Sequence, residues 1–225
     1  MLSFLSTLKH YLATRLGYIL LLLFGVLLPF QIFGDLAEDV WEHGGFPFDD
    51  PILLAIHSTA QPRLDILATT LTQFGVFWGV FPATLLLMLV LFNRREWRSL
   101  SYVVITAAGS IVINRAVKIL LHRVRPALWT SPSPELDYGF PSGHAMSSMT
   151  FVAMLVILSW NSRWRWLVLI AGSVFVVEIG WTRLYLGVHY PSDILAGWMA
   201  ALSWAIGVSF LIRPNRKSKL HQLEN

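Results

Sequence analysis

The chain has 225 residues, of which 55% are hydrophobic and 13% charged, and its mean hydropathy is +0.59. Because a soluble domain carries about a quarter charged residues, this composition excludes an ordinary soluble protein. The absence of cysteine excludes a disulfide framework, a thiolate metal site and a cysteine nucleophile. The net charge of +4 does not indicate nucleic-acid binding, since most basic residues occupy short loops between apolar runs, as in membrane proteins.

Six apolar runs predict an all-α, polytopic membrane protein with six transmembrane helices. A helix that crosses a bilayer needs about 20 residues at a rise of about 1.5 Å per residue. The expected spans are residues 16–33, 74–92, 100–121, 144–160, 166–181 and 194–212. The first run exceeds the apolar core of a signal peptide and lacks a clear cleavage site, so we expect it to be retained. Residues 1–225 are expected to form a single integral-membrane domain, with 213–225 as a cytoplasmic tail.

The positions of Lys and Arg predict the orientation. Basic residues precede the first expected span and follow the second, fourth and sixth, all on one side of a six-span chain: Lys9, Arg15, Arg94, Arg95, Arg98, Arg163, Arg165, Arg213, Arg216, Lys217 and Lys219. That side is expected to be cytoplasmic, with both termini on it, in a bacterial plasma membrane. Between the first two spans, the acidic segment 34–73 has apolar residues at spacings of three and four. It predicts one or two short amphipathic helices on the membrane surface or over the outer loops, with a solvated linker as the alternative.

Four cations lie at the opposite, extracytoplasmic ends of the expected helices, where topology disfavours them: Lys118, Arg123, Arg125 and Arg183. Lys118 and Arg125 are two helical turns apart, so they face the same way, about 10 Å apart, if the helix continues to Pro126. Converging cations favour an anion site. The alternative is that the longer side chains reach the lipid headgroups.

A Pro141-Ser142-Gly143-His144 turn precedes the fourth expected span. Free N–H groups and the positive end of the helix dipole favour an anion there, and Gly143 lets the backbone approach it closely. His144 can exchange a proton with the group that carries the anion, although a lone interfacial histidine is more often a polar anchor.

His189 lies six residues after Arg183 and four before Asp193. A carboxylate at that spacing can hold one imidazole nitrogen and leave the other free as a nucleophile. The alternative role for Asp193 is to cap the sixth expected span.

Together these residues resemble the three-part signature of the type 2 phosphatidic acid phosphatase superfamily. The first part runs from Lys118 to Arg125-Pro126, the second is the turn that ends at His144, and the third runs from Arg183 through His189 to Asp193. The stretch "FDDPILLAIH…LDILATTLTQFG" supports the resemblance weakly. One departure is Thr182, where the family commonly has serine.

The resemblance implies hydrolysis of a phosphomonoester or pyrophosphate, without metal or other cofactor, through a phosphohistidine. It assigns the nucleophile to His189, its orientation to Asp193, and proton transfer to and from the substrate to His144. The implied phosphate-binding residues are Lys118, Arg125, Ser142, Gly143, His144 and Arg183. The implied partners are the bilayer and a membrane lipid phosphate, namely phosphatidic acid, phosphatidylglycerol phosphate or undecaprenyl pyrophosphate.

Two other functions share some of these features. One is a non-enzymatic transporter or binding protein for anionic lipid. The other is a vanadate-dependent haloperoxidase, which uses a similar constellation but is larger and soluble. Outside the signature, Arg115 and Glu178 are ionisable residues within expected spans, and we expect them to pair, because buried charges in lipid are costly alone.

Overall fold

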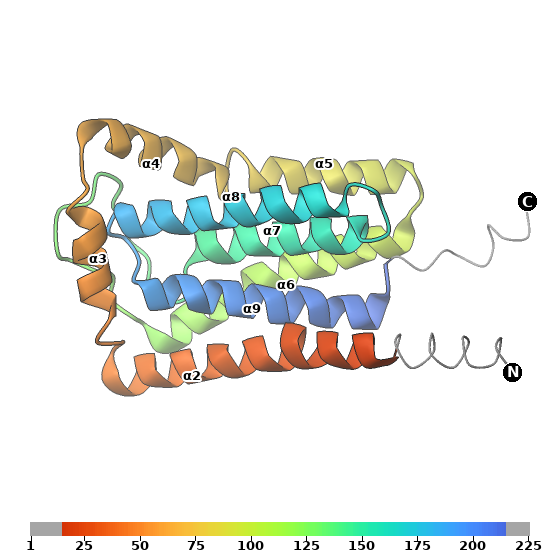
Figure 1. Cartoon of the computed structure of the whole chain (residues 1–225), viewed down its shortest axis with the longest axis horizontal. Helices are drawn as coiled ribbons and strands as arrows, with labels where there is room; N and C mark the ends of the chain where they lie inside the picture. Colours follow the sequence, from red (N-terminus) through yellow and green to blue (C-terminus); the bar gives the residue numbers. More distant parts are fainter. Residues whose placement is uncertain (1–14, 215–225) are drawn as a thin grey trace, which may run out of the picture.

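The long apolar stretches fold as helices that lie side by side in a computed structural model, which describes residues 15–214 (Figure 1). The first helix, Arg15–His43, contains the π-helical stretch η1 (Leu23–Leu27) followed by α2 (Leu28–His43). The next helices are α3 (Asp49–His57), α4 (Pro62–Phe74), α5 (Val80–Asn93), α6 (Trp97–Leu121), α7 (Gly143–Ser159), α8 (Arg165–Tyr185) and α9 (Pro191–Ile212). No strand occurs among these residues, so the all-α prediction is confirmed for them.

Within the described part of the chain, four helices are long and apolar enough to cross a membrane: Arg15–His43, α6, α8 and α9. The prediction of an integral membrane protein is thereby supported. Helices α5 and α7 are apolar but have only 14 and 17 residues. Since 14 residues rise about 21 Å and a bilayer core measures about 30 Å, the prediction of six spans is not confirmed. The expected tail beyond Pro214 and the basic residue Lys9 lie outside the described residues.

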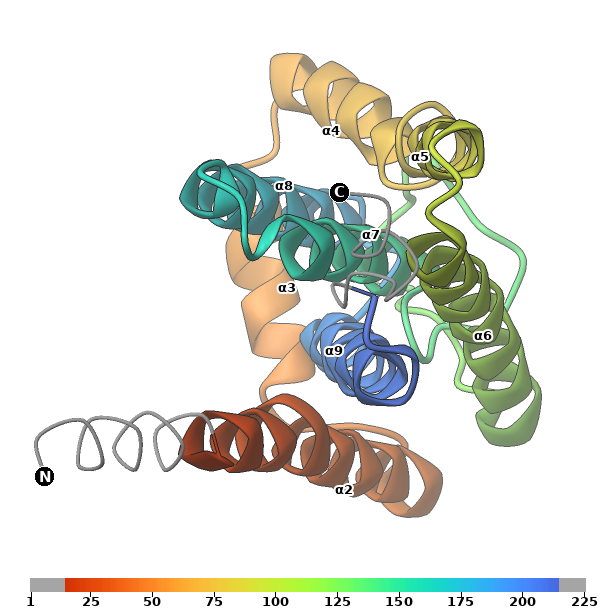
Figure 2. The same ribbon diagram turned by 90° about the vertical axis from the view of Figure 1, so that its right-hand side faces the viewer.

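The second expected span begins later than the sequence predicted. Its helix starts at Val80 rather than at residue 74, because residues 75–79 form turns between α4 and α5. Helix α4 packs obliquely on α8 and leads into α5 (Figures 1 and 2). The Ser147 hydroxyl of α7 donates a hydrogen bond of 2.6 Å to the Gly75 carbonyl. A side chain of α7 therefore holds the turns between α4 and α5 in place.

The first helix runs to His43 rather than ending at residue 33, so it includes the start of the acidic segment 34–73. The rest of that segment forms two short helices, α3 and α4, rather than a solvated linker. Helix α3 lies across one end of the bundle, where it contacts α8 and α9 (Figure 1). The first helix begins, and α9 ends, at the opposite end of the bundle. Whether α3 and α4 rest on a membrane surface stays a prediction.

Helices α7 and α9 lie at the centre of the bundle, with α2, α6 and α8 around them (Figure 2). Small side chains bring the two central helices close together, as is common between membrane helices. A Cβ atom on Gly197 of α9 would lie 2.9 Å from the carbonyl oxygen of Ser142. The Ser142 N–H in turn donates to the Asp193 carbonyl at 3.1 Å. The turn before α7 is thus held against the first turn of α9.

Candidate active site

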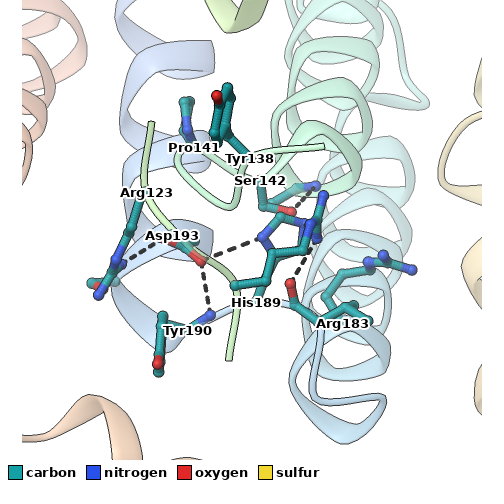
Figure 3. A network of polar contacts seen from close by, with 12 residues as sticks. Arg123, Tyr138, Pro141, Ser142, Arg183, His189, Tyr190 and Asp193 are labelled. Atoms are coloured by element: carbon teal, nitrogen blue, oxygen red, sulfur yellow. Dashed lines mark hydrogen bonds and ion pairs between the residues drawn. The ribbon is translucent and has the colours of Figure 1, made fainter. Parts of the chain in front are cut away.

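The three sequence motifs meet at the end of the bundle that α3 covers (Figures 1 and 3). Each predicted residue comes from a helix end or from a loop beside one. They are Lys118 near the end of α6, Arg125 in the following loop, Ser142, Gly143 and His144 at the start of α7, Arg183 in the last turn of α8, His189 in the next loop and Asp193 in the first turn of α9. The structure therefore brings all the predicted site residues together.

His189 is completely buried, and both of its ring nitrogens have partners. Its Nδ1 lies 3.3 Å from Oδ2 of Asp193, and its Nε2 lies 3.0 Å from Nη1 of Arg125. Since a guanidinium can only donate, Nε2 is the acceptor and Nδ1 carries the hydrogen that faces Asp193. Burial, together with the charges of Arg125 and Arg183, holds the pKa of His189 well below its ordinary value, which favours the neutral ring.

Asp193 both orients His189 and caps its helix, so the two interpretations from sequence describe one carboxylate. Its Oδ2 accepts a hydrogen bond of 2.8 Å from the Tyr190 N–H as well as facing His189 (Figure 3). Its Oδ1 lies 2.5 Å from Nη1 of Arg123. The side chain of Asp193 is wholly buried, with each oxygen occupied.

The expected cations are accompanied by two acidic residues that the sequence reasoning missed, Glu135 and Asp137. Lys118 lies 3.0 Å from the Asp137 carboxylate, and Nη2 of Arg125 lies 2.6 Å from Oε2 of Glu135. Arg183 also pairs with Glu135. The only sequence signal for this role was two acids in the loop that joins the first two motifs.

Glu135 occupies the point at which the cations and both histidines converge. Its oxygens lie 3.9 Å from Nδ1 of His144 and 4.0 Å from Nε2 of His189. Burial acts to raise the pKa of Glu135, but the charges of Arg183 and Arg125 outweigh it, so that this pKa is lowered. The carboxylate therefore stays ionised and is the anion that these cations contact.

Asp137 is held ionised in the same way. Burial acts to raise its pKa, but hydrogen bonds from Lys118 and Arg125 and their charges lower it to about 2. Of the three cations, Arg183 retains one unused donor, because its buried Nε has no partner among the described residues. The site thus contains a buried N–H group directed to no protein acceptor, which is costly unless a ligand or water satisfies it.

The condition for a continuous helix from Lys118 to Arg125 is not met, and one backbone donor of the turn before α7 is occupied. Helix α6 ends at Leu121, and His122 turns into the left-handed region with φ of 48°, so the helix does not continue to Arg125. Arg125 reaches the site from the loop, where its Nε and Nη1 donate to the carbonyls of Asp137 and Val188 at 2.7 and 2.6 Å. The Ser142 N–H is also unavailable to an anion, since it donates to Asp193.

The start of α7 keeps other donors for an anion. Ser142 caps the helix, with its hydroxyl accepting from the Ala145 N–H at 3.4 Å, and the Asn114 amide donates to the Pro141 carbonyl at 3.1 Å. The N–H groups of Gly143 and His144 precede the helix's own hydrogen-bond ladder. They replace Ser142 as the backbone donors of this turn.

Arg115 and Glu178 do not pair, contrary to the expectation from sequence. Arg115 lies 3.9 Å from Asp137, and its side chain is largely exposed. Glu178 is exposed on α8, where it lines a hollow with Phe74 and Phe175. The physical reason is that α7 separates α6 from α8 (Figure 2).

Within residues 15–214, no group of three or more His, Asp or Glu side chains is arranged to hold a metal ion. Metal independence itself stays a prediction, because this geometry does not test the reaction.

Comparison with known proteins places the chain in a family. The sequence model of the PAP2 superfamily matches residues 98–217, more than half of the chain. The undecaprenyl-diphosphatase of Sulfolobus acidocaldarius is 30% identical over 169 residues, covering 73% of this chain and 76% of that protein. Phosphatidylglycerophosphatase B of Bacillus subtilis is 28% identical over 160 residues, covering 68% of this chain and 78% of that protein.

A solved structure shares the fold. The crystal structure of a PAP2-type phosphatidylglycerolphosphate phosphatase from Bacillus subtilis matches with a TM-score of 0.77 and 24% identity, over 87% of this chain and all of that one. The helical bundle, the converging motifs and these relatives lead to one conclusion: the chain belongs to the PAP2 superfamily and is a membrane phosphatase, a hydrolase of phosphoric monoesters or diphosphates.

Proposed function

We propose that this protein hydrolyses a lipid phosphate monoester or pyrophosphate, without a metal ion, through a phosphohistidine at His189. The proposal depends on the tautomer and the orientation of the His189 ring. Asp193 holds its Nδ1, while its Nε2 is directed at the cluster of Arg125, Arg183 and Glu135. A neutral imidazole with a fixed tautomer, aimed into an anion-binding cluster, is suited to attack phosphorus.

The carboxylate of Glu135 supports the location of the phosphoryl group. It is the internal anion that contacts Arg125 and Arg183 and lies about equally far from the two histidines. We place the substrate phosphoryl group at this position, with Glu135 displaced from it. Lys118, Arg125, Arg183 and the first-turn N–H groups of α7 then stabilise the oxygens, whose charge must be held in the transition state.

In the first step Nε2 of His189 forms a bond to phosphorus as the bond from phosphorus to the leaving oxygen breaks. His144 donates a proton to that oxygen, and Asp193 stabilises the positive charge that develops on His189. In the second step the oxygen of a water molecule forms a bond to phosphorus as the bond from phosphorus to Nε2 of His189 breaks. His144 takes a proton from that water, and inorganic phosphate leaves with His189 neutral again. His144 thus donates one proton in the first step and takes one back in the second, so it returns to its starting protonation state.

The substrate is proposed to be a membrane lipid. Relatives with the names undecaprenyl-diphosphatase and phosphatidylglycerophosphatase B favour undecaprenyl pyrophosphate and phosphatidylglycerol phosphate, and phosphatidic acid remains a candidate from the sequence. We further propose that the chain crosses the bilayer six times, with the site at the extracytoplasmic face.

The decisive experiment is a phosphate-release assay in detergent with these three lipids, with and without EDTA. The wild type should release phosphate from at least one lipid in EDTA, and His189→Ala should release none. Turnover by His189→Ala at the wild-type rate would reject the phosphohistidine, and complete loss in EDTA would reject the metal-free reaction. Lipid binding without any phosphate release would favour the binding-protein alternative, and vanadate-dependent halide oxidation would favour the haloperoxidase.

A further inference from the structure

Arg123 is a buried cation that the proposed reaction does not use. The sequence placed it among four extracytoplasmic cations that favour an anion site, although not among the residues implied to bind phosphate. Its guanidinium lies on the opposite side of Asp193 from His189 (Figure 3). Only 6% of its surface is exposed. Burial of a charge is costly unless other groups compensate for it, so the residues that contact the Arg123 guanidinium should indicate its role.

Every nitrogen of the Arg123 guanidinium has a partner. Nη1 lies 2.5 Å from Oδ1 of Asp193 and 2.7 Å from Oγ of Ser192, and Nη2 lies 2.7 Å from Oδ2 of Asp49. Nε donates to the Gly44 carbonyl at 3.2 Å, and the Tyr190 ring covers one face of the group at 4.4 Å. The planar fork of arginine suits such a set of acceptors, whereas a lysine ammonium does not reproduce it.

Asp49 ties this arrangement to a distant part of the chain. Its Oδ1 accepts from the Ser192 N–H at 3.0 Å, and its Oδ2 accepts from the Ser192 hydroxyl at 2.6 Å as well as from Arg123. Asp49 is 3% exposed and begins α3, outside the residues 98–217 that match the family. The helix that covers the end of the bundle is therefore joined to the start of α9 through one buried carboxylate.

We propose that Asp49 and Arg123 are positioning residues for the reaction, which act on His189 through Asp193. Arg123 holds Oδ1 of Asp193, so the carboxylate cannot rotate and Oδ2 remains directed at Nδ1 of His189. Asp49 holds Arg123 and the Ser192 backbone in the geometry that this requires. The inference rests on the proposed function and extends it to α3, since small displacements of a reacting group can cost about a hundredfold in rate.

The chain offers a matched pair of substitutions for the test, Asp49→Asn and Asp50→Asn. Both remove one negative charge from the first turn of α3, but Asp50 is exposed whereas Asp49 is buried against Arg123. Asp49→Asn should lower kcat by about 10- to 100-fold and change KM by less than about twofold, because Lys118, Arg125 and Arg183 are untouched. Asp50→Asn should match the wild type. Equal kcat in the two variants, or an effect of Asp49→Asn on KM alone, would overturn the proposal.

A double-mutant cycle separates positioning from a general loss of structure. In an Asp193→Asn background, Asp49→Asn should lower kcat no further, because the residue through which it acts has already been altered. An undiminished further loss would show that Asp49 acts by another route. Arg123→Lys, which keeps the charge without the fork, should retain a kcat between those of Arg123→Gln and the wild type. No rescue by lysine relative to glutamine would contradict the role of the charge.

A readout without turnover keeps this inference distinct from the proposed function. In detergent-solubilised protein labelled with ¹⁵N-histidine, the signal lost in His189→Asn identifies His189. Its ring should carry hydrogen on Nδ1 in the wild type, in Asp50→Asn and in Asp49→Asn, because Arg125 still donates to Nε2. The ¹⁵N shift of Nδ1, which reports the hydrogen bond to Asp193, should match the wild type in Asp50→Asn and should move in Asp49→Asn. An unchanged Nδ1 shift in Asp49→Asn would overturn the positioning role. Failure of the wild type to release phosphate from any lipid would reject the proposed function instead, and the spectra would still decide the inference.

Discussion

Glu135 is the side chain whose charge most directly opposes a substrate phosphate. Because its carboxylate pairs with Arg125 and Arg183, replacement by glutamine should leave both cations freer to bind an anion. Glu135→Gln is expected to lower the inhibition constant of inorganic phosphate by about fivefold, equal to about 1 kcal/mol for a partly exposed ion pair. Glu42→Gln, at an exposed position of α2, is the control. An unchanged or higher inhibition constant in Glu135→Gln would show that this carboxylate does not compete with phosphate.

His189 should make the fold sensitive to mild acid. Its pKa is lowered by burial and by Arg125 and Arg183, whereas an unfolded histidine titrates near pH 6.5. The unfolded chain therefore binds more protons below that pH, and the stability that neutral His189 contributes above about pH 6.5 is lost as the pH falls towards its folded pKa. The free energy of unfolding in detergent should decrease between pH 7 and 5, and His189→Asn should reduce this slope. An identical slope in the variant would contradict the assignment.

The packing of α9 against the start of α7 depends on a glycine. Since a Cβ on Gly197 would lie 2.9 Å from the Ser142 carbonyl, Gly197→Ala should separate the turn from Asp193 and destabilise the protein by about 1–3 kcal/mol. Phosphate release should also fall. Gly207 of α9 has no neighbour of its Cβ position closer than 4.0 Å, so Gly207→Ala is the matched control. It should be neutral or stabilising, because alanine favours a helix by about 1 kcal/mol. Equal melting temperatures for the two variants would refute this account.

The helices show where sequence reasoning succeeds. Apolar runs located α6, α8 and α9 well, since each run is long and bounded by charges or proline. The break between α4 and α5 was missed because its cause is not local: the Ser147 hydroxyl that holds Gly75 belongs to α7. The expected span 100–121 ends where α6 ends, but the helix does not extend further to Arg125, because residues 122–125 are held by contacts to the later loops.

The site residues also divide into those that local sequence predicts and those that long-range contacts determine. The three motifs identified the residues that converge, because their chemistry is carried by side-chain type and short spacings. Glu135, Asp137 and Asp49 had no such signal, since an acid in a loop or in the first turn of a helix usually faces solvent or favours the helix dipole. Their partners are 48 residues away for Glu135 with Arg183, and 74 for Asp49 with Arg123. Only the folded arrangement assigns them to the site.

The proposed orientation of the bundle can be tested cleanly because the chain has no cysteine. Leu136→Cys lies on the exposed loop of the site, and Asn161→Cys lies between α7 and α8. In intact cells a membrane-impermeant maleimide should label only Leu136→Cys, and Asn161→Cys should react only after the membrane is opened. The reverse pattern would invert the proposed topology, and labelling of both from outside would contradict a membrane crossing by α7.

The buried link between Asp49 and Arg123 has a consequence for how such proteins can be recombined. The family match begins at residue 98, which suggests an obvious boundary for exchanging the front half of the chain with that of a relative. Such a chimera retains Arg123 and Ser192 but inherits whatever residue the donor supplies at the start of α3. A donor without a carboxylate there leaves the buried Arg123 guanidinium without one of its partners. A stable chimera therefore needs both parts of the chain from the same protein, or an aspartate restored at the position of Asp49.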